Sequence, residues 1–174
     1  MTVAARPTAA VELSIRRATL ADTGAIAAIY NQGIEERRAT FETRPQEADW
    51  AASRIASGEL FLVAERDGVV VGFAATLPYS DRHYYSGVAE AMLYVDRSAR
   101  RQGIGTTLLG VLADEAREAG LYKLIGKIFT MNEASGALVR RLGWREVGVH
   151  LRHGRLDDEW KDVLLVEKSL PIGR

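Results

Sequence analysis

The stretch from residue 88 to residue 120 constrains the fold more than any other part of the chain. A strand-like run, "VAEAMLYV", leads through "RSARRQGIG" into an amphipathic helical run that ends at Gly120. The free N–H groups of a first helical turn and the helix dipole together favour an anion at such a position. The stretch therefore predicts either a seat for a phosphate-bearing molecule or only a tight turn with solvated arginines.

The remaining patterns alternate between strand and helix periodicity. We expect strands at 11–18, at 60–79 as a hairpin around Asp67-Gly68, at 122–129, and twice between Trp144 and Leu170. We expect helices through Ala25–Ile34, around Trp50 and Ile55, and from a cap at Asn132 to Gly143. This order, β-α-α-β-β-β-α-β-α-β-β, predicts an α/β or α+β fold. Residues 1–10 are expected to be a flexible leader and residues 11–174 a single domain.

Composition narrows the classes of function. The 23 Lys and Arg residues balance 23 Asp and Glu residues, so the bulk charge does not indicate nucleic acid or an anionic membrane as a partner. The absence of cysteine excludes disulfides, thiolate metal sites and a cysteine nucleophile. No apolar run approaches the roughly 18 residues of a membrane span, and "MTVAARPTAAVE" lacks the apolar stretch of a secretory signal. The sequence therefore predicts a cytoplasmic protein.

Two sets of residues are expected to have no chemical role. His150 and His153 are spaced for neither one strand face nor one helical turn, so we expect no metal site. The three tryptophans, Trp50, Trp144 and Trp160, are expected to be packing residues.

Two segments resemble the GNAT acetyltransferase superfamily. Arg100, Gly103 and Gly105 fit its acetyl-CoA signature, Arg/Gln-x-x-Gly-x-Gly/Ala after the fourth strand. "KIFTMNEASGALVRRLGW" is similar to the later segment, in which an Asn opens a helix that ends in Leu-Gly-aromatic. Within the superfamily, "IRRATLADTGAIAAIYNQGIE", "TFETRPQE", "RHYYSGVAEAMLYVDRSARRQGIG" and "EWKDVLLVEKSLP" resemble phosphinothricin-type acetyltransferases and their arsinothricin-resistance relatives.

The resemblance implies a fold and a co-substrate. It implies a mixed, mostly antiparallel sheet with a V-shaped splay between the fourth and fifth strands, helices on both faces, and a homodimer. It also implies acetyl-CoA as the co-substrate, without a metal. The residues expected to bind it are Leu93, Tyr94, Val95, Arg100, Arg101, Gln102, Gly103, Ile104, Gly105, Thr106, Asn132 and Ser135. For Asn132, a role as a helix cap alone stays open.

Glu90 is the expected general base. Strand alternation places it on one face with Val88, Met92 and Tyr94, so a carboxylate interrupts an apolar face beside the glycine motif. Burial raises the pKa of a carboxyl group and makes the carboxylate a better proton acceptor. A charge on an edge strand facing water is the alternative. The resemblance implies a catalytic Glu at this spacing, acting directly or through a water.

The proton donor for the leaving thiolate is not evident from the sequence. Val139 occupies the position at which similar enzymes have Tyr or His. Tyr85, Tyr94 and His83 are the other candidates, and unassisted departure is tolerable because a thiol has a pKa of about 8.5. We expect the oxyanion to be stabilised by a backbone N–H of the fourth strand.

The loop "PYSDRHYYSGVAE" is expected to shape the acceptor pocket. Arg82 is suited to pair with a carboxylate, phosphinate or arsinate, and Tyr84 and Tyr85 to form walls. The resemblance places Arg82 and Tyr85 at substrate positions and Phe41 at the pocket floor. Asn31 and Glu35, one helical turn apart, are further candidates, although capping or solvent roles fit them equally.

These inferences predict direct acetyl transfer, within a ternary complex, to the α-amino group of a glutamate-like amino acid. Phosphinothricin, arsinothricin and methionine sulfoximine are acceptors of this kind, and their acetylation would confer resistance. Two alternatives stay open: an acetyltransferase of protein or peptide N-termini, and a non-catalytic acyl-CoA sensor that Val139 would suit.

Overall fold

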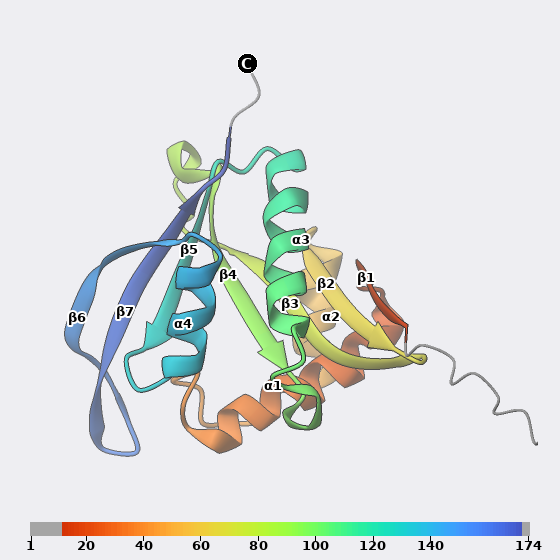
Figure 1. Ribbon diagram of the computed structural model, residues 1–174, viewed down its shortest axis with the longest axis horizontal. Coiled ribbons are helices and arrows are strands. Elements are labelled where there is room, and N and C mark those ends of the chain that lie inside the picture. Colours follow the sequence, from red (N-terminus) through yellow and green to blue (C-terminus); the bar gives the residue numbers. More distant parts are fainter. Residues whose placement is uncertain (1–11, 172–174) are drawn as a thin grey trace, which may run out of the picture.

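The protein is described here by a computed structural model covering residues 12–171, and its centre is one seven-stranded sheet (Figure 1). The spatial order is β1-β2-β3-β4-β5-β7-β6, and only β4 and β5 pair in parallel. The strands are β1 (Leu13–Arg17), β2 (Phe61–Arg66), β3 (Val69–Pro78), β4 (Val88–Val95), β5 (Lys123–Phe129), β6 (Arg145–Leu156) and β7 (Glu159–Ser169). The α-helices are α1 (Thr23–Glu36), α2 (Ala48–Ala56), α3 (Ile104–Glu118) and α4 (Glu133–Arg141).

The order of strands and helices expected from the sequence is confirmed. In the β2–β3 hairpin, Asp67 (φ 50°) and Gly68 (φ 78°) both take the left-handed conformation that a two-residue turn needs. Three short 3₁₀ helices, Leu20–Asp22, His83–Tyr85 and Arg97–Ala99, were not expected. The predicted leader, residues 1–10, lies outside the described residues.

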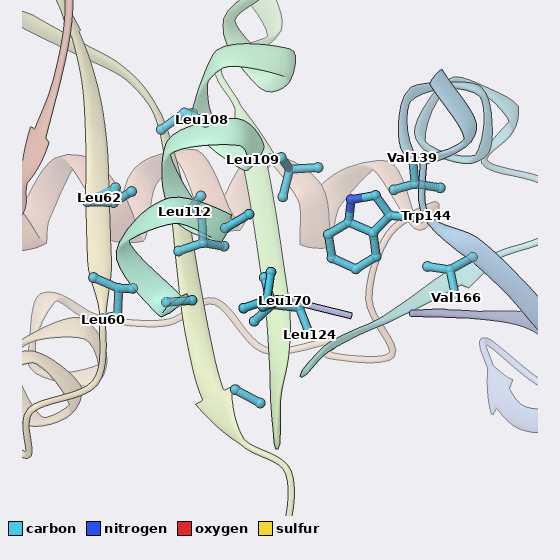
Figure 2. Close-up of a cluster of buried hydrophobic side chains, with 14 of the residues drawn as sticks. Leu60, Leu62, Leu108, Leu109, Leu112, Leu124, Val139, Trp144, Val166 and Leu170 are labelled. Carbon is cyan, nitrogen blue, oxygen red and sulfur yellow. The ribbon is translucent and has the colours of Figure 1, made fainter. Parts of the chain in front are cut away.

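Each face of the sheet has its own core. On one face, α3 and α4 cover small and branched side chains of β2–β5, and Figure 2 shows Leu108, Leu109 and Leu112 of α3 with Val139 and Trp144 beyond them. On the other face, α1 and α2 cover an aromatic cluster that includes Tyr30, Phe61 and Phe73. Full burial of such a side chain contributes roughly 1.5–3 kcal/mol. The two cores hold the sheet rigidly on both sides of β4.

The splay predicted between the fourth and fifth strands is present. β4 and β5 pair only where Val88–Glu90 meets Lys123–Ile125. Beyond that point β4 continues to Val95 and β5 to Phe129 without pairing, and Figure 1 shows their ends diverging. The edge of β4 beyond Glu90 is therefore unpaired on the side that faces β5.

The expectation for the tryptophans is wrong at one position. Trp144 is buried and Trp50 stacks on Tyr30, but the side chain of Trp160 is 56% exposed. Trp160 lies near the end of the β6–β7 hairpin, and the guanidinium of Arg155 lies 5.5 Å from its ring centroid. It therefore makes a cation–π contact at the surface.

His150 and His153 lie closer together than their spacing in the sequence predicts. A β-bulge between His150 and Gly154, with Arg152 at φ 50°, shifts the register of β6. The imidazoles of His150 and His153 consequently stack, with centroids 4.6 Å apart. Among residues 12–171, no group of three or more His, Cys, Asp and Glu side chains is arranged to hold a metal ion. No helix in the same range has the length and apolar character of a membrane span.

Candidate active site

A cavity of ≈ 490 Å³ opens where β4 and β5 separate, and its walls come from both faces of the sheet. On the α3–α4 face it is lined by Leu93, Leu109 and Leu138. On the α1 face it is lined by Tyr30, Phe41 and Glu90. The cavity thus joins the two faces of the sheet, and we call its two parts the α3 end and the α1 end.

The α3 end lies beside a set of free backbone donors. Gly103 is the N-cap of α3 at φ 81°, and the first bond closing the helix runs from the Thr107 N–H to the Gly103 carbonyl at 3.1 Å. Within residues 12–171, no backbone N–H from Arg101 to Thr106 donates to a protein acceptor. Such a row of amides at a helix N-terminus binds anionic oxygens.

Close packing explains the second glycine of the motif. A Cβ at Gly105 would lie 3.3 Å from side-chain carbons of both Leu93 and Leu138. The start of α3 can therefore approach β4 and α4 closely only because this residue has no side chain.

The loop before α3 is tied to α1. Asp96 accepts hydrogen bonds from the Ser98 hydroxyl and N–H and from Gln32 Nε2, and these bonds, Ser98 first, hold the pKa of its carboxyl below the ordinary value. Arg100 Nη1 pairs with Glu36 at 2.9 Å, and its Nε donates to the Val95 carbonyl at 3.1 Å. These contacts fix the loop that presents the free amides.

Some of the side chains predicted to bind acetyl-CoA are already engaged by other residues of the protein, and others are free to bind a ligand. The side chain of Arg100 is held by Glu36, and the side-chain oxygen of Gln102 accepts from Arg66. Arg101 is exposed and has no carboxylate partner among residues 12–171. Asn132 caps α4, because its Oδ1 accepts from the Ser135 N–H at 3.3 Å, and both residues line the cavity.

Glu90 occupies the α1 end. The predicted shared face of β4 is confirmed, because Met92 and Tyr94 pack against the α1–α2 core. In the parallel pairing Glu90 lies opposite Ile125, which places Lys127 diagonally across on the same face. Lys127 Nζ lies 2.6 Å from Glu90 Oε2, and both residues line the cavity. Glu90 thus faces the cavity, and its carboxylate is already paired with an ammonium group.

Two hydroxyl-bearing aromatic residues line the cavity beside Glu90. Tyr94 donates to the Ala39 carbonyl at 3.4 Å, and its ring lies edge-on to Tyr30 at 4.9 Å. Burial raises the pKa of Tyr94 well above its ordinary value, so its hydroxyl stays protonated. Tyr30 shares a 3.2 Å hydrogen bond with Thr40, and burial likewise raises its pKa.

The loop after α1 and the bulge of β6 close the α1 end. The Phe41 ring lies edge-on to Phe129 at 4.6 Å, and a Cβ at Gly154 would be 2.6 Å from it. Phe41 lines the cavity, as predicted for the pocket floor, and His153 lines it as well.

Sequence reasoning missed His153 and Lys127. The bulge that turns His153 toward the cavity has no signal in the sequence. Lys127 had one, because it interrupts an apolar strand just as Glu90 does.

Several predicted acceptor residues lie elsewhere in the chain. Arg82 Nη1 donates to the Tyr84 hydroxyl at 3.0 Å, and Tyr85 borders a separate depression of ≈ 250 Å³ beside Tyr79. These residues do not line the central cavity, nor does His83. Asn31 and Glu35 do not line it either. Both polar atoms of the Asn31 side chain bond to the Gln46 backbone, and Glu35 pairs with Arg97. The structure does not bring these residues to Glu90 within one chain.

Residues 26–144 match the acetyltransferase (GNAT) family. The chain belongs to this family. An L-amino acid N-acyltransferase of Escherichia coli (strain K12) is 31% identical over 162 residues, covering 91% of this chain and 94% of the relative. A phosphinothricin N-acetyltransferase of Streptomyces viridochromogenes is 32% identical over 154 residues, covering 87% and 84%. An L-methionine sulfoximine/L-methionine sulfone acetyltransferase of Pseudomonas paraeruginosa is 32% identical over 162 residues, covering 90% and 94%.

Solved structures agree with the family. The structure of a ribosomal-protein-alanine N-acetyltransferase from Brucella melitensis has a TM-score of 0.86 and 38% identity, covering 90% of this chain and 99% of that one. A GNAT superfamily phosphinothricin acetyltransferase from Sinorhizobium meliloti, in complex with acetyl-CoA, has a TM-score of 0.85 and 28% identity, covering 91% and 88%.

The GNAT chain is an acetyl-CoA-dependent N-acetyltransferase, and its residues fit that co-substrate. The amides from Arg101 to Thr106 suit a pyrophosphate, and the unpaired edge of β4 suits a chain that carries amide groups. The cavity runs from this edge of β4, at Leu93 and Tyr94, to Glu90. The two ends of the cavity therefore have the features that a donor and an acceptor require.

Proposed function

We propose that the protein acetylates the α-amino group of a small, glutamate-like amino acid with a strongly polar side group. Phosphinothricin and arsinothricin, whose side groups are anionic, and methionine sulfoximine, whose side group is neutral, are acceptors of this kind, and acetylation would detoxify them by blocking the amino group. The observation that carries the proposal is the cavity that runs from Leu93 and Leu138, against which Gly105 of α3 packs, to the carboxylate of Glu90. The names of the curated relatives support the same class of acceptor.

The donor is held from the α3 end. Backbone N–H groups from Arg101 to Thr106 bind the pyrophosphate, and Arg101 adds a positive charge. The unpaired edge of β4 and the Asn132–Ser135 turn guide the rest of acetyl-CoA toward the splay. Leu93 and Leu138 exclude water from the path.

The acceptor is activated from the α1 end. Glu90 takes a proton from the substrate ammonium, directly or through one water, and the free amine attacks the thioester carbonyl. A C–N bond forms and the C–S bond breaks within the ternary complex, while a backbone N–H of β4 stabilises the oxyanion. The attacking nitrogen loses its surplus proton to water as the amide forms. The chain has no cysteine, so no acyl group can be carried on a cysteine side chain.

The leaving thiolate receives its proton from water in this proposal. Val139 lines the cavity and has no proton to give, and Tyr85 and His83 lie outside the lining. Tyr94 lines the cavity, but burial raises its pKa, so proton transfer from it to a thiolate is unfavourable. Release without a general acid is feasible because thiols have a pKa of about 8.5.

A thiol-release assay with acetyl-CoA and a panel of amines tests the proposal. Phosphinothricin and methionine sulfoximine should be acetylated with a kcat/KM at least tenfold above that of any peptide. The competing acceptor is a protein N-terminus, which the name of the Brucella melitensis structure favours. Preference for a peptide that begins with alanine would replace the proposed acceptor class. If none of the amines gave thiol release, a non-catalytic sensor would be favoured. The role predicted for Arg82 is tested in the same panel, because Arg82→Ala should raise KM most for acceptors with two anionic groups.

The protein further associates as a homodimer through β6 in this proposal. β6 is an edge strand, and Val147, Val149 and Leu151 on it are 43%, 48% and 75% exposed. Figure 1 shows β6 at the outer margin of the sheet. An edge with exposed apolar side chains is suited to pair with another strand. Light scattering should give twice the chain mass for the protein and a monomer for Leu151→Lys, and a monomeric protein would refute the association.

A further inference from the structure

The ion pair of Glu90 and Lys127 places two opposite charges side by side at the reacting end of the cavity. Lys127 Nζ lies 2.6 Å from Glu90 Oε2, and the Glu90 and Lys127 side chains are 27% and 44% exposed. Neither side chain has another hydrogen-bond partner among residues 12–171. Lys127 is also the only Lys or Arg among the described residues that line the cavity.

The Lys127 ammonium lies where an acceptor must place its own ammonium. A proton can pass from a substrate amine to Glu90 only if that amine comes within hydrogen-bond reach of the carboxylate. The arriving ammonium must therefore displace Lys127 from Glu90. The displaced Lys127 ammonium, which is partly exposed, regains a charge-assisted hydrogen bond only if the acceptor also brings an anionic group.

A free α-amino acid supplies that partner. Its ammonium and carboxylate are attached to one carbon atom, so both charges arrive together. Exchange of partners leaves two charge-assisted pairs, substrate ammonium with Glu90 and substrate carboxylate with Lys127. A peptide N-terminus or a simple amine brings the ammonium alone and leaves Lys127 without a partner.

We propose that Lys127 selects acceptors with a free α-carboxylate by exchanging its ion pair with Glu90 for one with the substrate. This inference rests on the proposed function, which it deepens by assigning the α-carboxylate to a residue. Neither the position of Arg82 nor the side group of the acceptor enters the argument.

The test measures binding, so that it does not depend on turnover. Calorimetry compares L-methionine sulfoximine with its α-carboxamide, each titrated into protein saturated with CoA. Loss of one charge-assisted hydrogen bond costs about 1.5–3 kcal/mol, so the acid should bind about 10- to 100-fold more tightly than the amide. In Lys127→Met the two affinities should agree within about threefold, whereas Lys127→Arg should keep most of the preference.

Lys123→Met is the matched control. Lys123 lies on the same strand and the same face, but it pairs with Glu167, which Arg145 also contacts. This variant should keep the full preference of the wild-type protein for the acid. Any change in the basicity of Glu90 affects both ligands alike and cancels in the ratio.

Three results would overturn the inference: equal binding of acid and amide by the wild-type protein, no binding of either, or a preference that survives in Lys127→Met. Turnover measured in parallel keeps the two proposals separate. Acetylation of methionine sulfoximine without acid–amide discrimination would refute the role of Lys127 alone. Acid–amide discrimination without acetylation would refute the proposed reaction alone.

Discussion

The α3 end and the α1 end of the cavity are built in different ways. The α3 end depends on one contiguous segment, Arg101–Thr106, whose backbone conformation is local. The α1 end depends on segments far apart in the chain, since Glu90, Lys127, Phe41 and His153 come together only through strand register and a β-bulge. In the proposed assignment, donor recognition is therefore a local property of this sequence, and acceptor recognition is a property of the assembled sheet.

Glu90→Gln should have the largest effect and should separate the two ends most clearly. Removal of the base should lower kcat by at least about 100-fold, because general-base catalysis contributes roughly 10²–10⁴. In the proposed function acetyl-CoA binds from the other face of the sheet, so its Kd by calorimetry should change less than twofold. Turnover within threefold of the wild-type rate would exclude Glu90 as the base.

Gly103→Val should affect the α3 end selectively. Gly103 has φ 81°, which a β-branched residue adopts only under strain, so the amide row should be distorted. The Kd of acetyl-CoA should rise about tenfold, which corresponds to the loss of about one charge-assisted hydrogen bond.

Gly120→Val is the control for that substitution. Gly120 has φ 88° just beyond the C-terminal end of α3, so the variant has similar strain far from the amide row. Its acetyl-CoA Kd should match that of the wild-type protein. Equal weakening in both variants would assign the effect to general loss of stability.

Phe41→Leu should have a smaller effect than Gly103→Val, and this effect should fall on the acceptor and not on acetyl-CoA. The ring lines the cavity against Phe129, and a lost contact the size of one methylene is worth about 0.8 kcal/mol. The acceptor KM should rise about fourfold while the acetyl-CoA KM stays unchanged. A larger effect on the acetyl-CoA KM than on the acceptor KM would break the assignment of Phe41 to the acceptor.

The smallest effect should be in the pH profile of kcat/KM, which should not fall at alkaline pH. An essential acid lowers the rate once it loses its proton, which gives the falling limb of a bell-shaped profile. Tyr94 is the only predicted acid that lines the cavity, and burial raises its pKa. The value of kcat/KM should therefore rise with pH and then stay level up to about pH 9. This pH is still below the ordinary tyrosine pKa of about 10, so Tyr94 keeps its proton throughout. A fall between pH 7 and 8.5 would indicate another group as a general acid.

The fold was largely predictable because its determinants are local. The Asp67-Gly68 turn, the alternation of β4 and the glycines before α3 each specify their own conformation. The splay was expected from the resemblance alone, since no residue pattern in β4 or β5 indicates where the pairing of these two strands ends.

The candidate site was predictable only in part. Glu90 and Phe41 line the cavity, whereas Arg82 and the two tyrosines after it lie outside it. The contact of Glu90 with Lys127 depends on the register of two strands joined by α3, which a single sequence does not specify. The stacking of His150 on His153 depends on a β-bulge, which a single sequence does not specify either.

A crystal structure of the complex with CoA and methionine sulfoximine would show both ends of the cavity occupied at once. The CoA pyrophosphate should lie on the amides from Arg101 to Thr106, and its thiol should lie in the splay between β4 and β5. The acceptor amino group should lie within hydrogen-bond reach of Glu90. An acceptor bound beside Arg82 and Tyr85, away from Glu90, would contradict the proposed function.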